Sequence, residues 1–301
     1  MALQKEIWIT SIIGLLFANN SFAARAIDHS EFADNKTVHV PNAADTEAAR
    51  KTRLRSAGDK NLALEVSDTD LTYNIEQYFV GPYVIPKLEE VELSYNKRES
   101  LVQRITEKVR QALFSDLLTK WLPATPTKIA TSGDSVAATA PSATGNRNAM
   151  SKNDVLEIKK KFDKWDISQE GRCILLDADM YNQLLNDLTT NESSAFLATA
   201  DAAKGIVGKL YGFDFYERST VYITAAGGTI KTGAAAATDC VAGLAWSDKC
   251  VSRAVGEIEL YDNPGDATEF GDVISVDVRA GGSIIRSDGK GVLIIYQGTP
   301  A

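Results

Sequence analysis

The chain has 301 residues, 44% of them hydrophobic, so it can bury a sizeable core in one or two domains. Its formal net charge of −8 at pH 7 argues against tight, sequence-independent binding to nucleic acid, which requires clustered lysine and arginine. No apolar run is long enough to cross a bilayer, and three cysteines, an odd number, do not make a disulfide framework.

The segment from Lys5 to Ala26, KEIWITSIIGLLFANNSFAARA, has two interpretations. One is a secretion signal with Lys5 as its positive charge, an apolar run over 7–18 and a small-x-small cleavage site at 21–23. The other is a folded segment, because Glu6 cancels Lys5 and the apolar residues recur at helical spacing. We favour the second interpretation and keep the signal as its alternative.

Paired strands and a long helix are expected next. Residues 42–60 are small, charged and turn-rich, which predicts an exposed extension or loop. Alternating apolar residues predict strands at 37–40, 62–66 and 71–75, which could form a hairpin of two or three strands. Such a hairpin buries little of itself and needs a neighbour to lie on.

The clearest helix spans residues 97–122. Its apolar residues recur every four positions, Pro123 marks its end, and Ser94 or Asn96 could cap its start. This apolar stripe consists of Leu101, Ile105, Val109, Leu113, Leu117 and Trp121.

The rest of the chain mixes loops, short helices and strands, which predicts an α+β fold rather than alternating βαβ units. A strand over CILLD and a helix over ADMYNQLLND are expected in its middle. Loops are expected at 123–150 and 225–239, a second helix after Ser151, Gly-punctuated strands over 205–224, and antiparallel hairpins over 272–297.

No group of residues indicates catalysis. The only two histidines, His29 and His39, lie early in the chain, which makes a zinc site or a catalytic triad improbable. Asp177 and Asp179 follow an apolar strand and could bind a metal, but helix capping explains them more simply. We therefore expect a protein that is not an enzyme, with no catalytic residue, no metal and no cofactor.

The cysteines give two further expectations. Cys173 lies within CILLD and should be buried as a small hydrophobe. Cys240 and Cys250 flank VAGLAWSDK and could pair across a loop, although thiols usually stay reduced in cytoplasm.

The order and spacing of the longer motifs carry a resemblance to a known family. TVHVPN and TDLTYNIEQYFVGPYVIPKLEEVELSYNKRESLV come first, RCILLDADMYNQLLND and GIVGKLYGFDFYERSTV follow, and FGDVISVDVRAGGSIIRSDGKGVLIIYQ closes the chain. This series resembles the major capsid (coat) proteins of tailed bacteriophages, whose fold is named after phage Hong Kong ninety-seven and is shared with encapsulins. The motifs are similar, in turn, to the extended-loop hairpin leading into a spine helix, to the axial domain, and to strands that return to the peripheral domain.

The resemblance implies a division of the chain. We expect an N-terminal arm at 1–36, an extended-loop hairpin at 37–92, and a peripheral domain with the spine helix and the following loop at 93–150. The axial domain would cover 151–258, and closing strands would return to the peripheral domain over 259–301.

The resemblance also implies a role and partners. The chain would form hexamers and pentamers of an icosahedral shell around double-stranded DNA, which it would enclose without sequence-specific binding. Its partners would be itself, a separate scaffolding protein, a portal protein and decoration proteins, in the virion capsid, assembled in host cytoplasm and without a membrane. The expected assembly contacts are Trp8, Ile12, Leu16, Phe17, Phe22, Tyr73, Tyr78, Phe79 and Trp121.

Three other functions stay open. An encapsulin-like nanocompartment would have the same fold around a protein cargo. A secreted or periplasmic binding protein would follow if residues 1–23 were a signal peptide. A metal-dependent enzyme would use Asp177 and Asp179.

Overall fold

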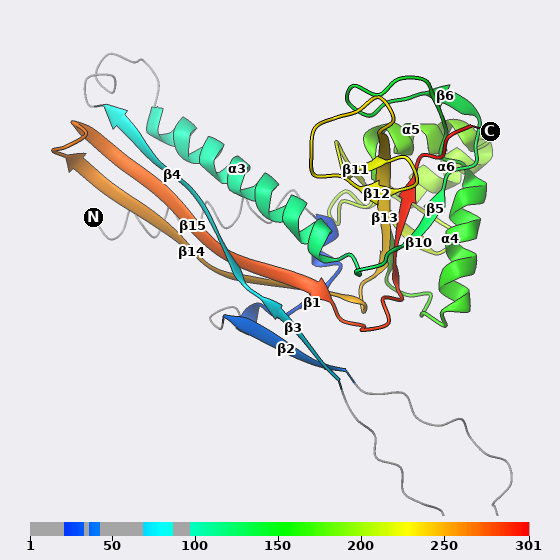
Figure 1. Cartoon of the computed structure of the whole chain (residues 1–301), viewed down its shortest axis with the longest axis horizontal. Coiled ribbons are helices and arrows are strands. Elements are labelled where there is room, and N and C mark those ends of the chain that lie inside the picture. Colours follow the sequence, from blue (N-terminus) through cyan, green and yellow to red (C-terminus); the bar gives the residue numbers. More distant parts are fainter. Residues whose placement is uncertain (1–20, 33–35, 43–68, 87–96, 301) are drawn as a thin grey trace, which may run out of the picture.

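The computed structural model describes residues 21–32, 36–42, 69–86 and 97–300, and these form an elongated layer joined to a compact body (Figure 1). The strand predicted at 62–66, the caps Ser94 and Asn96, and the segment 1–20 lie outside the described residues, as does the extension predicted at 42–60 except for Asn42, which ends a strand. The predicted α+β class is confirmed.

The elongated layer consists of one long helix on one face of a four-stranded sheet (Figure 1). Helix α3 (Lys97–Lys120) confirms the helix predicted at 97–122. The sheet has the strand order β1-β14-β15-β4, in which β1 runs parallel to β14 and the other pairs are antiparallel. Its strands are β1 (Ile27–Asp28), β14 (Val251–Asp266), β15 (Gly271–Ile284) and β4 (Glu76–Pro86).

The apolar stripe of α3 packs on this sheet, as its four-residue period predicts. Five of its six members are buried, and Leu101 packs against the same core from a half-buried position. Alternate residues of β15, namely Ile274, Val276, Val278 and Ala280, face the helix. The helix and one face of the sheet therefore share a continuous hydrophobic core.

The compact body is built on an eight-stranded sheet. Its central strands β8 (Arg172–Asp177) and β13 (Cys240–Ser247) are buried at every position because both faces of the sheet are covered. The helices are α4 (Lys152–Lys164), α5 (Ala178–Asp187) and α6 (Thr190–Ala198). The other strands are β5 (Thr127–Ala130), β9 (Gly208–Leu210), β10 (Phe213–Arg218), β11 (Tyr222–Ala225), β12 (Thr229–Ile230) and β16 (Val292–Tyr296).

Neighbouring residues of β8 belong to two different cores. Cys173 and Leu175 join the core that contains α3, whereas Ile174 and Leu176 join the core under α4, α5 and α6. Because strand side chains alternate between faces, one apolar strand links the compact body to the elongated layer.

The strand predicted over CILLD is confirmed as β8, and the helix predicted over ADMYNQLLND is confirmed as α5. Asp177 caps α5, because its side chain accepts a hydrogen bond from the backbone N–H of Asp179 (3.1 Å). The helix predicted after Ser151 is α4, which Ser151 caps. Helix α6 was not predicted, although Thr189 and Glu192 form a capping box that the sequence already displays.

Two sequence predictions about strands are wrong. Residues 123–150 are not simply a loop: they contain β5, which pairs in parallel with β16, and the pair β6 (Ser135–Ala137) and β7 (Asn146–Asn148). Strands β15 and β16 do not form a hairpin with each other, because β15 pairs with β14 and β4 while β16 pairs with β13 and β5. The pairs β5–β16 and β4–β15 join strands that are remote in sequence, and local patterns do not identify such partners.

The two short strands β2 (Thr37–Asn42) and β3 (Thr69–Asn74) pair as predicted. Their neighbour belongs to the same chain, since Val38 and Tyr73 pack against Ala254 of β14. The predicted domain boundaries remain a prediction, and β14 runs continuously through the one placed at 258/259.

All three cysteines are free and buried. The burial predicted for Cys173 is confirmed. The pairing considered for Cys240 and Cys250 is not formed, because the length of β13 lies between the two residues.

Candidate assembly surfaces

Phe22 and Trp121, two of the expected assembly contacts, are buried inside the single chain. Phe22 is 4% exposed, and its ring meets those of Phe114, Trp121 and Trp246 edge-on, with centroids 5.9, 6.1 and 6.4 Å away. The indole N–H of Trp121 donates to the Ser252 carbonyl at 2.9 Å. These rings join the N-terminal segment, helix α3 and the compact body, so they stabilise the chain itself.

Tyr73 is also an internal residue. Its hydroxyl lies 3.1 Å from His29 Nδ1, and the two rings stack with centroids 6.4 Å apart. Burial raises the pKa of Tyr73 above its usual value. The sequence could not distinguish this aromatic residue from an exposed one, because its burial depends on the distant strand β14.

Tyr78 holds β4 to α3. Its hydroxyl donates to Asp116, and it accepts a hydrogen bond from Lys120 at 3.2 Å. Burial first, and then the Asp116 carboxylate, raise the pKa of Tyr78 to about 12. Lys120 also pairs with Glu76 and Asp116 at 2.9 Å each, so this cluster fixes the edge strand to the helix.

Phe79 points to the opposite side from Tyr78 and is 73% exposed. In the sheet register it lies beside Asp277 of β15, which in turn lies opposite Glu259 of β14. We call this side of the sheet, away from α3, the outer face, and define it by Phe79, Glu259, Tyr261, Asp277 and Arg279. Tyr261, which is 48% exposed, adds a second aromatic side chain to it.

The carboxylates of the outer face are held by neighbouring side chains. Gln77 donates to Asp277, and the Tyr261 hydroxyl donates to Glu259. The hydrogen bond to Glu259 raises the pKa of Tyr261, because the carboxylate stabilises the protonated hydroxyl. An ordered surface that combines exposed aromatic residues with polar groups suits contact with another protein better than with DNA, whose phosphates these carboxylates would repel.

Strand β4 is also an edge strand. Among the residues that the structure describes, β15 is its only strand partner, and its other edge is unpaired. An unpaired edge of 11 residues can accept a strand or loop of another chain through backbone hydrogen bonds.

The expected contacts Trp8, Ile12, Leu16 and Phe17 lie outside the described residues. Of the expected contacts that the structure describes, Phe79 is by far the most exposed, whereas Tyr78 is half-buried against α3. Sequence reasoning missed Tyr261 and Phe270, two further exposed aromatic residues on β14 and at the β14–β15 turn.

Several solved structures with this arrangement come from phage capsids, and one comes from a virus-like particle of Pyrococcus furiosus (TM-score 0.56, 10% identity, covering 97% of this chain and 99% of that one). The chain is similar to the capsid of Ralstonia phage GP4 (TM-score 0.64, 14% identity, covering 94% of this chain and 89% of that one). It is similar to the capsid of cyanophage Pam1 (TM-score 0.62, 11% identity, 94% and 93% covered) and to that of cyanophage P-SCSP1u (TM-score 0.61, 16% identity, 92% and 87% covered).

At these identities the likeness establishes the fold. The chain has the fold of tailed-phage major capsid proteins, and the resemblance stated from the sequence is confirmed at that level. No protein-family model and no curated protein sequence matches the chain.

Proposed function

We propose that the chain is the structural subunit of a phage-type capsid rather than an enzyme. It would assemble as hexamers and pentamers into an icosahedral shell that encloses double-stranded DNA. The observation that carries this proposal is the similarity to phage capsid chains over more than nine-tenths of the sequence. Scaffolding, portal and decoration proteins would be its partners, and the virion capsid, assembled in host cytoplasm, its location.

The architecture supports this role physically. Helix α3 and the Tyr78–Lys120 cluster stiffen one side of the elongated layer and leave the outer face accessible. A rigid surface loses little conformational entropy on binding, which favours repeated contacts between copies. The net charge of −8 suits a container that does not grip its DNA. None of the described helices could span a membrane.

Particle size is the experiment that tests the proposal. We expect full-length protein, expressed alone and together with a candidate scaffolding protein, to give closed uniform shells or capsomer rings in sedimentation and negative-stain imaging. Shells that hold a protein cargo and exclude DNA would instead support the nanocompartment. A stable monomer whose intact mass lacks the first 23 or so residues would refute the shell and support secretion.

Phe79 is our proposed assembly contact on the outer face. Because its side chain is 73% exposed, Phe79→Asp should leave the subunit folded while it disrupts a contact buried between copies. The matched control is Tyr211→Asp, which changes an exposed aromatic residue of the compact body. Loss of shells in the first variant alone, with unchanged circular dichroism, is the expected result, and equal assembly of both variants would exclude Phe79 as a contact.

A further inference from the structure

The turn between β14 and β15 presents an aromatic side chain to solvent. Phe270 is 81% exposed, and its backbone has a φ of 52°, a left-handed conformation that is uncommon for a bulky residue. The next residue must be glycine, because a Cβ at Gly271 would clash with the Ile85 carbonyl of β4. The turn is therefore built against the end of the sheet, and it holds Phe270 outward.

The tip of this hairpin is strongly acidic. Residues 259–272 contain five carboxylates and no lysine or arginine. Asp266 is held within the turn by hydrogen bonds from the backbone N–H of Thr268 and from Asn263 Nδ2, both 2.8 Å long. The hairpin thus carries an apolar knob surrounded by negative charge.

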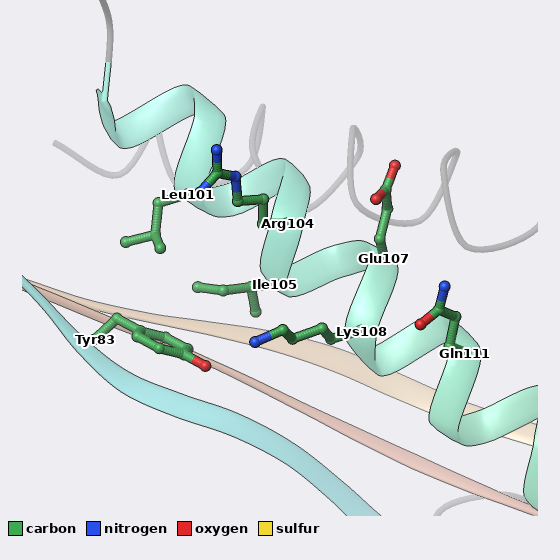
Figure 2. Close-up of a pocket in the computed structure, with 7 residues that line it drawn as sticks. All are labelled: Tyr83, Leu101, Arg104, Ile105, Glu107, Lys108 and Gln111. Carbon is green, nitrogen blue, oxygen red and sulfur yellow. The ribbon is translucent and has the colours of Figure 1, made fainter.

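A pocket of complementary character lies between α3 and β4 (Figure 2). Its volume is about 370 Å³, within the range of sites that accept small ligands. Figure 2 shows Leu101, Ile105 and Tyr83 around the space between helix and sheet, with Lys108 reaching over Tyr83. The Lys108 Nζ lies 5.9 Å from the centre of the Tyr83 ring.

The charges around this pocket complement the tip. Arg104 and Lys108 contribute two positive charges to its lining, against one negative charge from Glu107. An aromatic ring that entered beside Leu101 and Ile105 would also meet the Lys108 ammonium, which is attracted to the face of an aromatic ring. The acidic residues flanking Phe270 would meet Arg104 and Lys108.

We propose that Phe270 of one subunit inserts into the α3–β4 pocket of a second copy of this chain. The proposal rests on the proposed shell function and names one of its contacts. The tip does not fill the pocket of its own chain, because Phe270 is 81% exposed. Phe270 and the pocket are different surfaces of the chain, so the contact between two copies is head-to-tail. Each copy can then bind the next through the same contact until a ring closes.

Cysteine cross-linking tests this contact directly. Phe270→Cys and Leu101→Cys are made in separate, differently tagged chains and assembled together, so that a disulfide between the two positions can form only between copies. We expect an oxidised heterodimer from the mixture and from neither variant alone. The matched control replaces Phe270→Cys with Tyr211→Cys, an aromatic turn residue that is 37% exposed and also has a positive φ of 50°.

The outcomes separate this inference from the proposed function. Shells without the heterodimer, as expected if another protein filled the pocket, would overturn the contact and leave the shell intact. A homodimer of Phe270→Cys chains would show that tips meet tips and would also overturn it. If wild-type protein forms no shells under any condition tested, both proposals fail.

A second variant guards against perturbation by the new cysteines. Phe270→Asn keeps a residue that tolerates positive φ and removes the ring. We expect it to raise the subunit concentration required for assembly about tenfold or more, as loss of an aromatic anchor does. Tyr211→Asn should leave that concentration unchanged, and equal behaviour of both variants would refute the proposal.

Discussion

The aromatic cluster around Phe22 gives the sharpest prediction for the single chain. Phe22→Ala removes a ring that is 4% exposed and contacts three other rings edge-on. Truncating a buried phenylalanine to alanine costs about 3–5 kcal/mol of unfolding free energy. The three ring contacts place this site at about 4 kcal/mol, because each favourable aromatic pair adds to the loss of buried area.

Two comparison variants define the reference for this loss. Phe22→Leu fills most of the same volume and should cost about 1 kcal/mol. Phe32→Ala changes an aromatic residue of the same N-terminal segment that is 51% exposed, and should cost at most about 0.5 kcal/mol. A chain without residues 1–23 should lose at least as much stability as Phe22→Ala, because it also lacks Phe22 and the buried Ala23.

The assay is urea unfolding of the unassembled subunit, followed by tryptophan fluorescence. Two of the four tryptophans, Trp121 and Trp246, lie in the cluster and report directly on its opening. If Phe22→Ala and Phe32→Ala lower the unfolding free energy equally, the segment around Phe22 is not docked in solution, and the reasoning is refuted. The truncated chain would then also unfold like wild type.

Three further predictions concern buried polar groups. Burial raises the pKa of Asp177 from 3.8 to about 6, so the folded state binds its proton more tightly than the unfolded state does. Ionising this group should therefore lower the unfolding free energy by about 2–3 kcal/mol as pH rises from 4 to 6. Urea midpoints of Asp177→Asn, measured over the same pH range, should not show this decrease. Arg172 is buried and donates to the Ser168 carbonyl (2.9 Å) and to Asp163 (2.8 Å), so Arg172→Met should lower the unfolding free energy by about 2–3 kcal/mol in the same assay. The side chain of Asp163 is 44% exposed, so an equal loss for Asp163→Asn would contradict this account. The three buried thiols, Cys173, Cys240 and Cys250, should not react with a maleimide in the folded chain, and all three should react in urea, as counted by mass spectrometry. Labelling of the native chain would show that these sites open to solvent.

Local patterns predicted the elements whose burial has a regular period. The four-residue spacing from Leu101 to Trp121 identified α3 because one helix face meets one sheet. The apolar run CILLD identified β8 because both faces of that strand are covered. In contrast, β5 has a half-exposed pattern and depends on β16, more than 160 residues away, so its own sequence contains little signal.

The placement of the residues expected at assembly contacts was harder to predict than the fold. Tyr78 and Phe79 were both expected at subunit contacts, yet adjacent residues of a strand point to opposite faces, so only one of them could reach the outer face. That distinction was available from alternation alone. The burial of Phe22 was not, since it requires the N-terminal segment to lie against the end of α3, about 100 residues further along the chain.

The two exposed aromatic residues proposed as contacts lie on the same stiff element. Phe79 is in register with Asp277, six residues along β15 from Gly271 at the turn, which corresponds to about 20 Å of strand. Substitutions at positions this far apart, with no shared contacts, have additive effects on free energy. The same sheet carries Phe79 and the turn with Phe270, and α3 packs on the face of that sheet opposite to Phe79. When a partner binds at one of these residues, the orientation of the other is therefore already set, and no additional segment has to lose conformational entropy. In the proposed shell, each contact can therefore be weak and their geometry still be defined.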